Sequence, residues 1–399
     1  MKQELIHEYS TLENLRTPIK EPKNTFNVNF IEGAFFEVLG PQQKEYYVTM
    51  TDLTTGKILH SATVTNNMWT KSNIKYFVNW EIKAIDTETN EVACLHIFNP
   101  KGSRIYIHLD SSAIGDTLAW FPHVDEFRKR WDCEIVVSTF KNDWFESLYP
   151  ELEFVSPGEV VSNIYAMFGI GWFYNEDHTF DSTRVQRDFK GIPLGQTASD
   201  ILGLPYKEIK PLIDFADLGR PIKEKYVVIA PHGSAHAKYW NHPGGWQTVI
   251  DTLNEKGYKV MMITSEPLGD DWHDSKLGGT LKNVIDKTGN KHIRVRMNQL
   301  KHAEAFIGVG SGLSWLAWSI GTPVTLISGF SESYTEFKDC ERVTTPKGLC
   351  NGCFNREWLN PGDWEWCPDH KDTPRHFECT KSITPNMVLK AVDNILHFE

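Results

Sequence analysis

The sequence of 399 residues predicts an α/β protein with three parts, a small antiparallel β domain followed by two blocks of alternating strands and helices. The chain is too long for one ordinary core, so two or three domains are expected. In residues 26–98 apolar and polar side chains alternate with a period of two, as in half-exposed antiparallel strands. Beyond Pro100 apolar runs alternate with stretches of helical spacing, which is typical of parallel sheets covered by helices.

The first domain is expected to span residues 1–99 and to begin with a polar arm over residues 1–25. Its clearest alternating run covers residues 76–84, and turn residues follow at 87–90. Two earlier runs, 46–52 and 57–64, are joined by a turn at residues 54–56. These runs predict an antiparallel sheet.

The second domain is expected over residues 100–222 and the third over residues 223–399. In the second domain residues 105–109 and 134–138 read as strands, with helical spacing over 116–131 between them. A charged, proline-containing linker at residues 220–225 precedes the third domain. The third domain is expected to contain a helix at 246–256 and strands at 226–230, 259–264, 305–309 and 323–327. Two α/β blocks joined in this way predict facing domains with a ligand cleft between them.

Composition excludes some classes of function. The net charge of −11 argues against a non-specific nucleic-acid binder, which needs a basic face. Residues 306–330 carry no charge, but five glycines and a proline interrupt them, so no membrane span is expected there. Residues 1–22 lack the apolar core of a signal peptide, which predicts a cytoplasmic protein.

Asp116 is the candidate general base. It follows the first predicted strand of the second domain, in a turn that also contains Gly115, and such a turn faces the cleft. An aspartate at the start of a helix is also a common capping residue. Position alone leaves both interpretations open.

Lys238 is the candidate cation for a diphosphate. It lies in a run of small residues after the first strand of the third domain, close to Trp240. An ammonium there can bind a phosphate group. A solvated surface lysine is the alternative.

A glycine-rich loop after the strand at 305–309 is the candidate anion-binding loop. Its residues are Gly310, Ser311, Gly312, Leu313 and Ser314, and a helix is expected to begin at Trp315. Several unpaired N–H groups and a helix dipole then point at one place, which suits a diphosphate.

Four cysteines form the candidate metal site. Cys350, Cys353, Cys367 and Cys379 are spaced C-x2-C-x13-C-x11-C, and four thiolates suit zinc or an iron centre of the rubredoxin type. Two disulfides are the alternative, which the absence of a signal peptide argues against.

These stretches together resemble the ADP-heptose glycosyltransferases. In those enzymes an S-x-L-G-D turn, a segment ending in K-x-W, and a late T/S-G-L-x-x-L-A with G-x-P occur in this order. Here they correspond to residues 112–116, 238–240 and 311–323. Because the chain also has the β domain and the four cysteines, it most resembles one subgroup, the bacterial autotransporter heptosyltransferases. This resemblance covers essentially the whole chain. The chain differs from the wider group at three positions: it has Gly310 in place of an Asp, Trp315 in place of a His, and Asp110 in place of a Lys.

The resemblance implies an enzyme of the GT-B fold that moves heptose from ADP-heptose to serine hydroxyls of an autotransporter passenger in the bacterial cytoplasm. It implies an inverting reaction with Asp116 as base, a structural iron on the cysteines, and a homo-oligomeric, dodecameric ring. No catalytic divalent metal is expected. The donor would contact residues at the start of the late helix and in two earlier loops, namely Lys238, Ser265, Ser311, Gly312, Leu313, Ser314 and Trp315.

Two other functions remain open at this level. One is a glycosyltransferase of the same fold with another nucleotide sugar or a saccharide acceptor, which a donor panel would identify. The other is a catalytically silent scaffold. Retention of Asp116, Lys238 and the glycine-rich loop together argues against a scaffold.

Overall fold

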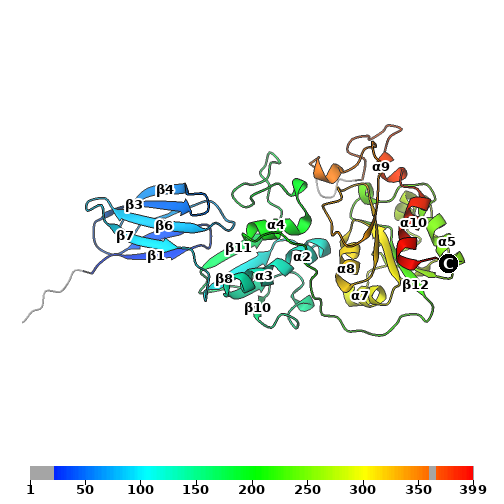
Figure 1. The fold of residues 1–399 in the computed structure, drawn as a ribbon, viewed down its shortest axis with the longest axis horizontal. Coiled ribbons are helices and arrows are strands. Elements are labelled where there is room, and N and C mark those ends of the chain that lie inside the picture. The colour runs from blue at the N-terminus through cyan, green and yellow to red at the C-terminus, as the bar shows by residue number, and fades with distance from the viewer. Residues whose placement is uncertain (1–21, 359–364, 399) are drawn as a thin grey trace, which may run out of the picture. The chain divides into compact units, whose positions relative to one another are not determined.

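The computed structural model describes residues 22–358 and 365–398, so most of the predicted polar arm lies outside the described part. The chain divides into two compact units. The first holds residues 22–74 and Val78–Asn99, and the second holds Lys75–Phe77 and the chain from Pro100 onward (Figure 1). Among the described residues, no helix is both long enough and apolar enough to cross a membrane.

The first unit is built from two antiparallel sheets, with strand orders β1-β2-β5 and β4-β3-β6-β7. Phe36, Val48 and Ile82 are fully buried in it. The predicted antiparallel β domain is confirmed, although the run expected from residue 76 forms a strand only from Trp80. The strands are β1 (Thr25–Asn29), β2 (Phe35–Leu39), β3 (Glu45–Asp52), β4 (Lys57–Thr65), β5 (Trp69–Lys71), β6 (Trp80–Asp86) and β7 (Val92–Ile97).

The second unit begins with a four-stranded parallel sheet of order β10-β9-β8-β11. The helix expected over residues 116–131 is two helices, because Pro122 has no N–H to continue the first and starts the second. The elements are β8 (Arg104–Leu109), α2 (Ile114–Trp120), α3 (Pro122–Trp131), β9 (Glu134–Ser138), the 3-10 turn η1 (Asn142–Trp144), β10 (Leu152–Val155), β11 (Ala166–Ile170), η2 (Phe189–Gly191) and α4 (Leu194–Ile201).

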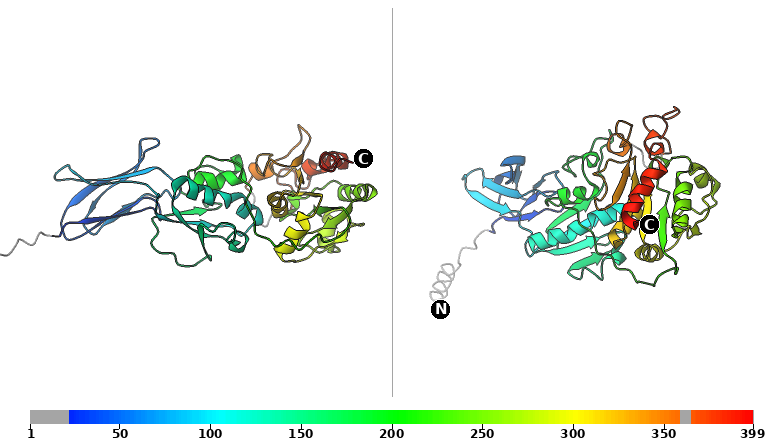
Figure 2. Two further views of the ribbon diagram at one scale, coloured as in Figure 1. Left: turned by 60° about the horizontal axis from the view of Figure 1, so that its bottom comes forward. Right: turned by 45° about the vertical axis from the view of Figure 1, so that its right-hand side comes forward.

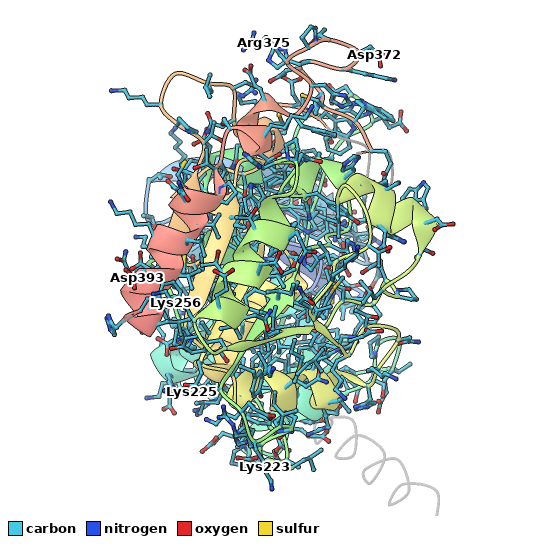
Figure 3. All side chains as sticks on the ribbon, turned by 90° about the vertical axis from the view of Figure 1, so that its right-hand side faces the viewer. Lys223, Lys225, Lys256, Asp372, Arg375 and Asp393 are labelled. Atoms are coloured by element: carbon cyan, nitrogen blue, oxygen red, sulfur yellow. The ribbon has the colours of Figure 1, made fainter. Side chains whose placement is uncertain are left out.

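A six-stranded parallel sheet of order β14-β13-β12-β15-β16-β17 follows in the same unit. Figure 3 shows α10 beside α5 on one side of this sheet, with Lys256 and Asp393 on the exposed surface. The elements are β12 (Tyr226–Ala230), η3 (His236–Lys238), α5 (Gly245–Glu255), β13 (Lys259–Met262), α6 (Asp271–Lys276), β14 (Ile285–Asp286), α7 (Ile293–Lys301), β15 (Ala305–Val309), α8 (Gly312–Ile320), β16 (Val324–Ser328), β17 (Glu341–Thr344), η4 (Cys353–Asn355), α9 (Glu378–Lys381) and α10 (Pro385–Leu396).

Helices α2 and α8 meet between the two parallel sheets (Figures 1 and 2). Each has a glycine in its first turn that the other helix approaches closely. A Cβ at Gly115 would lie 3.0 Å from Cδ1 of Trp315, and a Cβ at Gly312 would lie 2.8 Å from Cβ of Ile114. The two helix starts therefore stand face to face.

Candidate active site

A cavity of about 820 Å³ lies in the second unit where α2 and α8 begin. It is bounded by segments that follow the carboxyl ends of β8, β11, β12, β15 and β16, the edge where open parallel sheets bind ligands. The sequence-predicted residues that line it are Asp116, Lys238, Ser311, Gly312 and Trp315.

The Asp116 carboxylate is held by two donors rather than used as a helix cap. Its Oδ2 accepts from Ser111 Oγ at 2.6 Å and from Trp172 Nε1 at 2.8 Å. The N-cap of α2 is Ala113, which has no side-chain cap bond, so the capping interpretation of Asp116 is wrong. Burial raises the pKa of Asp116, and the two hydrogen bonds and the Lys238 charge oppose that rise.

Lys238 lies at the end of η3 and is half-buried rather than a fully solvated surface lysine. Its Nζ donates to Ser234 Oγ at 3.1 Å and stands 6.0 Å from the ring centre of Phe330. Burial lowers the pKa of Lys238, whereas the charges of Asp116 and Glu336 raise it. The ammonium of Lys238 is thus within reach of the fields of two carboxylates.

The last residues of the glycine-rich loop are already helical, because α8 begins at Gly312 and not at the predicted Trp315. Ser314 Oγ accepts from the Ser311 N–H at 3.2 Å and donates to the Ser311 carbonyl at 2.6 Å, which fixes the first turn. Ser314 is buried, and neither it nor Leu313 is among the residues lining the cavity. Ser311 and Gly312 supply the exposed end of the helix.

Ser265 lies apart from the other predicted donor residues. It follows β13, its hydroxyl donates to Glu266 Oε1 at 2.7 Å, and it does not line the cavity. Its contact with the donor stays a prediction.

One wall of the cavity is aromatic and was not predicted from the sequence; it is made of Trp172, Tyr174, Phe189, Phe354 and Trp358. The ring centroids of Trp172 and Phe189 are 4.4 Å apart, and those of Tyr174 and Trp358 are 4.6 Å apart. Trp172 lies two residues after the end of β11, a strand that was not predicted. The apolar run 166–170 before Gly171 and Trp172 was the signal available for it.

The cysteine segment fits a metal with soft ligands. All seven cysteines of the chain are free thiols in this structure, so the predicted alternative of two disulfides is not formed. Cys350 Sγ and Cys353 Sγ lie 3.0 Å and 3.9 Å from Asp369 Oδ2, and the three groups are close enough to share one ion. Burial, followed by the Asp369 charge, raises the pKa of Cys353.

Cys367 and Cys379 are buried nearby. Their charges also raise the pKa of Cys353, and Cys367 packs with Cys353 in one cluster, but neither belongs to the two close candidate groups found among the described residues. A second such group combines Cys350, His370 and Glu378. Thiolates placed this way suit zinc or iron, and a bound ion would hold the segment together through Cys350 and Cys353.

Two facing parallel sheets, with a carboxylate, a lysine and a glycine-rich helix start at the cavity, define a glycosyltransferase of the GT-B fold. The sequence pattern of glycosyltransferase family 9 (heptosyltransferase) matches residues 180–335. The autotransporter heptosyltransferase BAHTCr of Citrobacter rodentium is 33% identical over 93% of this chain and 89% of its own length. TibC of Escherichia coli O78:H11, an autotransporter heptosyltransferase, is 34% identical over 94% of this chain and 90% of its own. The chain belongs to the autotransporter heptosyltransferases.

The chain is also similar to solved structures of TibC and to one further relative. The crystal structure of TibC, an iron-containing dodecameric glycosyltransferase, matches with a TM-score of 0.82, covering 96% of this chain and 98% of TibC. TibC has also been solved in complex with ADP-D-beta-D-heptose. BimC of Burkholderia thailandensis, described as an inactive autotransporter heptosyltransferase, is 29% identical over 88% of this chain and 82% of its own length. The predicted family and fold class are confirmed.

Proposed function

We propose that this protein transfers heptose from ADP-heptose to serine hydroxyls of an autotransporter passenger protein. The observation that carries the proposal is the cavity in which Asp116, Lys238 and the start of α8 come together. The likeness to TibC, whose complex contains ADP-D-beta-D-heptose, supports the choice of donor. As the resemblance implies, we infer that transfer takes place in the bacterial cytoplasm before the acceptor is exported.

Asp116 acts as general base in this proposal. Because Oδ2 already accepts two hydrogen bonds, we assign the proton transfer to Oδ1. The serine oxygen attacks the anomeric carbon as Asp116 takes its proton, and the bond from that carbon to the diphosphate oxygen breaks. Attack from the side opposite the leaving ADP inverts the anomeric carbon. General-base assistance contributes roughly 10²- to 10⁴-fold in rate.

Positive charge for the leaving ADP comes from the chain itself. Lys238 and the backbone N–H of Gly312, at the start of α8, would bind the diphosphate and stabilise the charge that develops on it. We therefore propose that transfer needs no catalytic divalent cation. Transfer that stops when chelator is added and returns with magnesium would contradict this.

The cysteine segment is proposed to hold one structural metal per subunit. The iron of TibC favours iron, and zinc is the alternative. Such an ion would cross-link the cysteine segment and take no part in heptose transfer, because its thiol ligands lie in a loop rather than at Asp116.

We also propose a homo-oligomer, a dodecamer by analogy with TibC. Strand β7 in the first unit exposes Val92, Leu95 and Ile97 by 50–56%, which gives a second copy of the chain an apolar surface to cover. Light scattering should report a mass about twelve times that of one chain. Leu95→Lys should give smaller particles, whereas Leu218→Lys, at an exposed site of the second unit, should not.

The test of the activity is intact-mass analysis of a passenger protein incubated with purified enzyme and ADP-heptose. Each transferred heptose adds one fixed mass increment, and peptide mapping locates it on serine. Asp116→Asn is the matched inactive control, since the amide keeps the shape but cannot take the proton. If the passenger is modified only when another nucleotide sugar is supplied, that nucleotide sugar is the donor instead of ADP-heptose. If the protein is inactive with every donor, it is a scaffold.

A further inference from the structure

We propose that Glu336 recognises hydroxyl groups of the sugar that this site transfers, and so helps to select the donor sugar. The inference rests on the proposed function. It assigns a role to a carboxylate that sequence analysis did not single out. Three observations support this role: the hydrogen bonds of the Glu336 carboxylate, its closeness to Gly310, and the charges around the cavity.

Glu336 is a buried carboxylate that nevertheless lines the cavity. It is 8% exposed, and it lies in the segment between β16 and β17. A carboxylate so well buried is rare unless it is paired. Its position at the wall of a cavity therefore calls for an explanation in terms of its partners.

Two partners fix the direction of this carboxylate. Oε2 accepts from Arg342 Nη1 at 2.9 Å, and Oε1 accepts from Ser331 Oγ. Arg342 is itself anchored, because its Nη2 donates to the Phe337 carbonyl at 2.9 Å. Each carboxylate oxygen has two lone pairs, so each retains capacity for a further hydrogen bond.

Gly310 makes room for Glu336 beside the anion-binding loop. A Cβ at Gly310 would lie only 2.7 Å from Glu336 Oε1, closer than real side chains come. Gly310 and Ser311 line the same cavity. The carboxylate oxygen thus occupies the space next to the start of α8 that a side chain at residue 310 would fill.

The charges decide what Glu336 binds. A diphosphate at the start of α8 and at Lys238 is negative, and a second anion at Oε1 would be repelled. Neutral O–H donors do not have this cost, and a buried carboxylate binds them more strongly than it would in water. A sugar attached to that diphosphate brings several such hydroxyls. Glu336 therefore fits the sugar, and Lys238 fits the diphosphate.

A purely structural ion pair is the competing explanation, since both Glu336 and Arg342 are largely buried. The two explanations differ in one measurable way. A structural pair supports ADP and ADP-sugar binding alike, or affects only stability. A sugar-binding carboxylate contributes to the affinity for the ADP-sugar but not to the affinity for ADP.

The experiment is calorimetric titration of the parent and Glu336→Gln with ADP and with ADP-heptose. The variant should bind ADP within about twofold of the parent. Its affinity for ADP-heptose should fall about ten- to hundredfold, as expected for the loss of a hydrogen bond to a charged group. Glu332→Gln is the matched control, because Glu332 does not line the cavity and should leave both affinities unchanged.

Two further arms keep the outcomes separate. The double variant Glu336→Gln, Arg342→Gln leaves no unpaired buried charge, so it preserves the test if the single variant unfolds, and the same selective loss is expected. Equal effects on both ligands, or none on either, would overturn the role of Glu336. A parent protein that binds ADP-heptose no better than ADP and transfers no heptose would overturn the proposed function and this inference together.

Discussion

At the scale of single residues, the site is asymmetric about Asp116, because Ser111 and Trp172 both donate to the same oxygen. Hydrogen bonds to an ionised carboxylate stabilise that form and lower its pKa, whereas burial raises it. The turn and the family resemblance single out Asp116 as the candidate base, whereas Trp172 could not be predicted as its partner, because nothing local relates residue 172 to residue 116. Only the parallel pairing of β11 with β8 brings them together.

Trp172→Phe is expected to raise the pKa of Asp116. The ring still fills the wall but no longer donates, so the ionised form loses a stabilising bond. The rate constant kcat/KM needs ionised Asp116, so its acidic limb should move to higher pH and activity should fall most at low pH. A pH–rate profile measures this. Ser111→Ala should shift the limb in the same direction, and a lower plateau with an unmoved limb would mean that Trp172 only packs.

Lys238→Ala is expected to weaken ADP binding by about one to two powers of ten, the size of a charge-assisted hydrogen bond. The rate at saturating donor should fall too, because the same charge stabilises the leaving ADP. Lys238→Arg should restore little, since a planar guanidinium does not replace a compact ammonium. Calorimetry with ADP decides the matter, and unchanged affinity in a folded Lys238→Ala protein would remove Lys238 from the donor site.

At the scale of elements, the close approach of α2 to α8 places Asp116, the proposed base, opposite the glycine-rich start of α8. The sequence predicts that Gly115 admits a ligand or backbone, and the structure shows that the approaching group is the Trp315 ring. Strands 226–230 and 305–309 have their predicted bounds, because buried parallel strands read as unbroken apolar runs. β10 has only four residues and includes Glu153, so its pattern is too weak to be identified in the same way.

Gly312→Ala tests this helix contact. The added Cβ would lie 2.8 Å from Cβ of Ile114, which belongs to a stiff β-branched side chain, so the helices must separate. Overpacking of this kind costs roughly 1–3 kcal/mol of stability. The rate of transfer should fall as Asp116 and the loop move apart. Thermal unfolding and transfer assays measure both effects, and Gly191→Ala, which has nothing within 4 Å, should change neither.

At the scale of the whole molecule, the cysteine segment connects the candidate metal site to the cavity. Phe354 follows Cys353 directly and lines the cavity, as does Trp358. Cys353 also packs in one cluster with Phe330, the ring near Lys238. The spacing of the cysteines predicts a metal from sequence alone, but their proximity to the cavity follows only from the fold, because the segment is far from Asp116 in the chain.

Cys353→Ser should therefore affect more than metal content. Loss of one thiolate should lower bound metal well below one ion per chain and remove ligation free energy on the order of 10 kcal/mol from this segment. Elemental analysis and thermal unfolding measure these effects. Cys340→Ser is the matched control, because the Cys340 thiol contacts the Phe337 carbonyl at 3.6 Å and belongs to neither candidate metal group.

The same variant separates support of the cavity wall from support of the donor site. Phe354 and Trp358 form part of the wall, whereas Ser311 and Gly312 lie at the start of α8, which packs on β15 and β16. Transfer should therefore fall several-fold or more while ADP affinity, measured by calorimetry, stays within a few-fold of the parent. Parallel loss of ADP binding would show that the segment supports the whole unit. A parent protein without stoichiometric metal, or with its cysteines mapped as disulfides, would rule out the metal site itself.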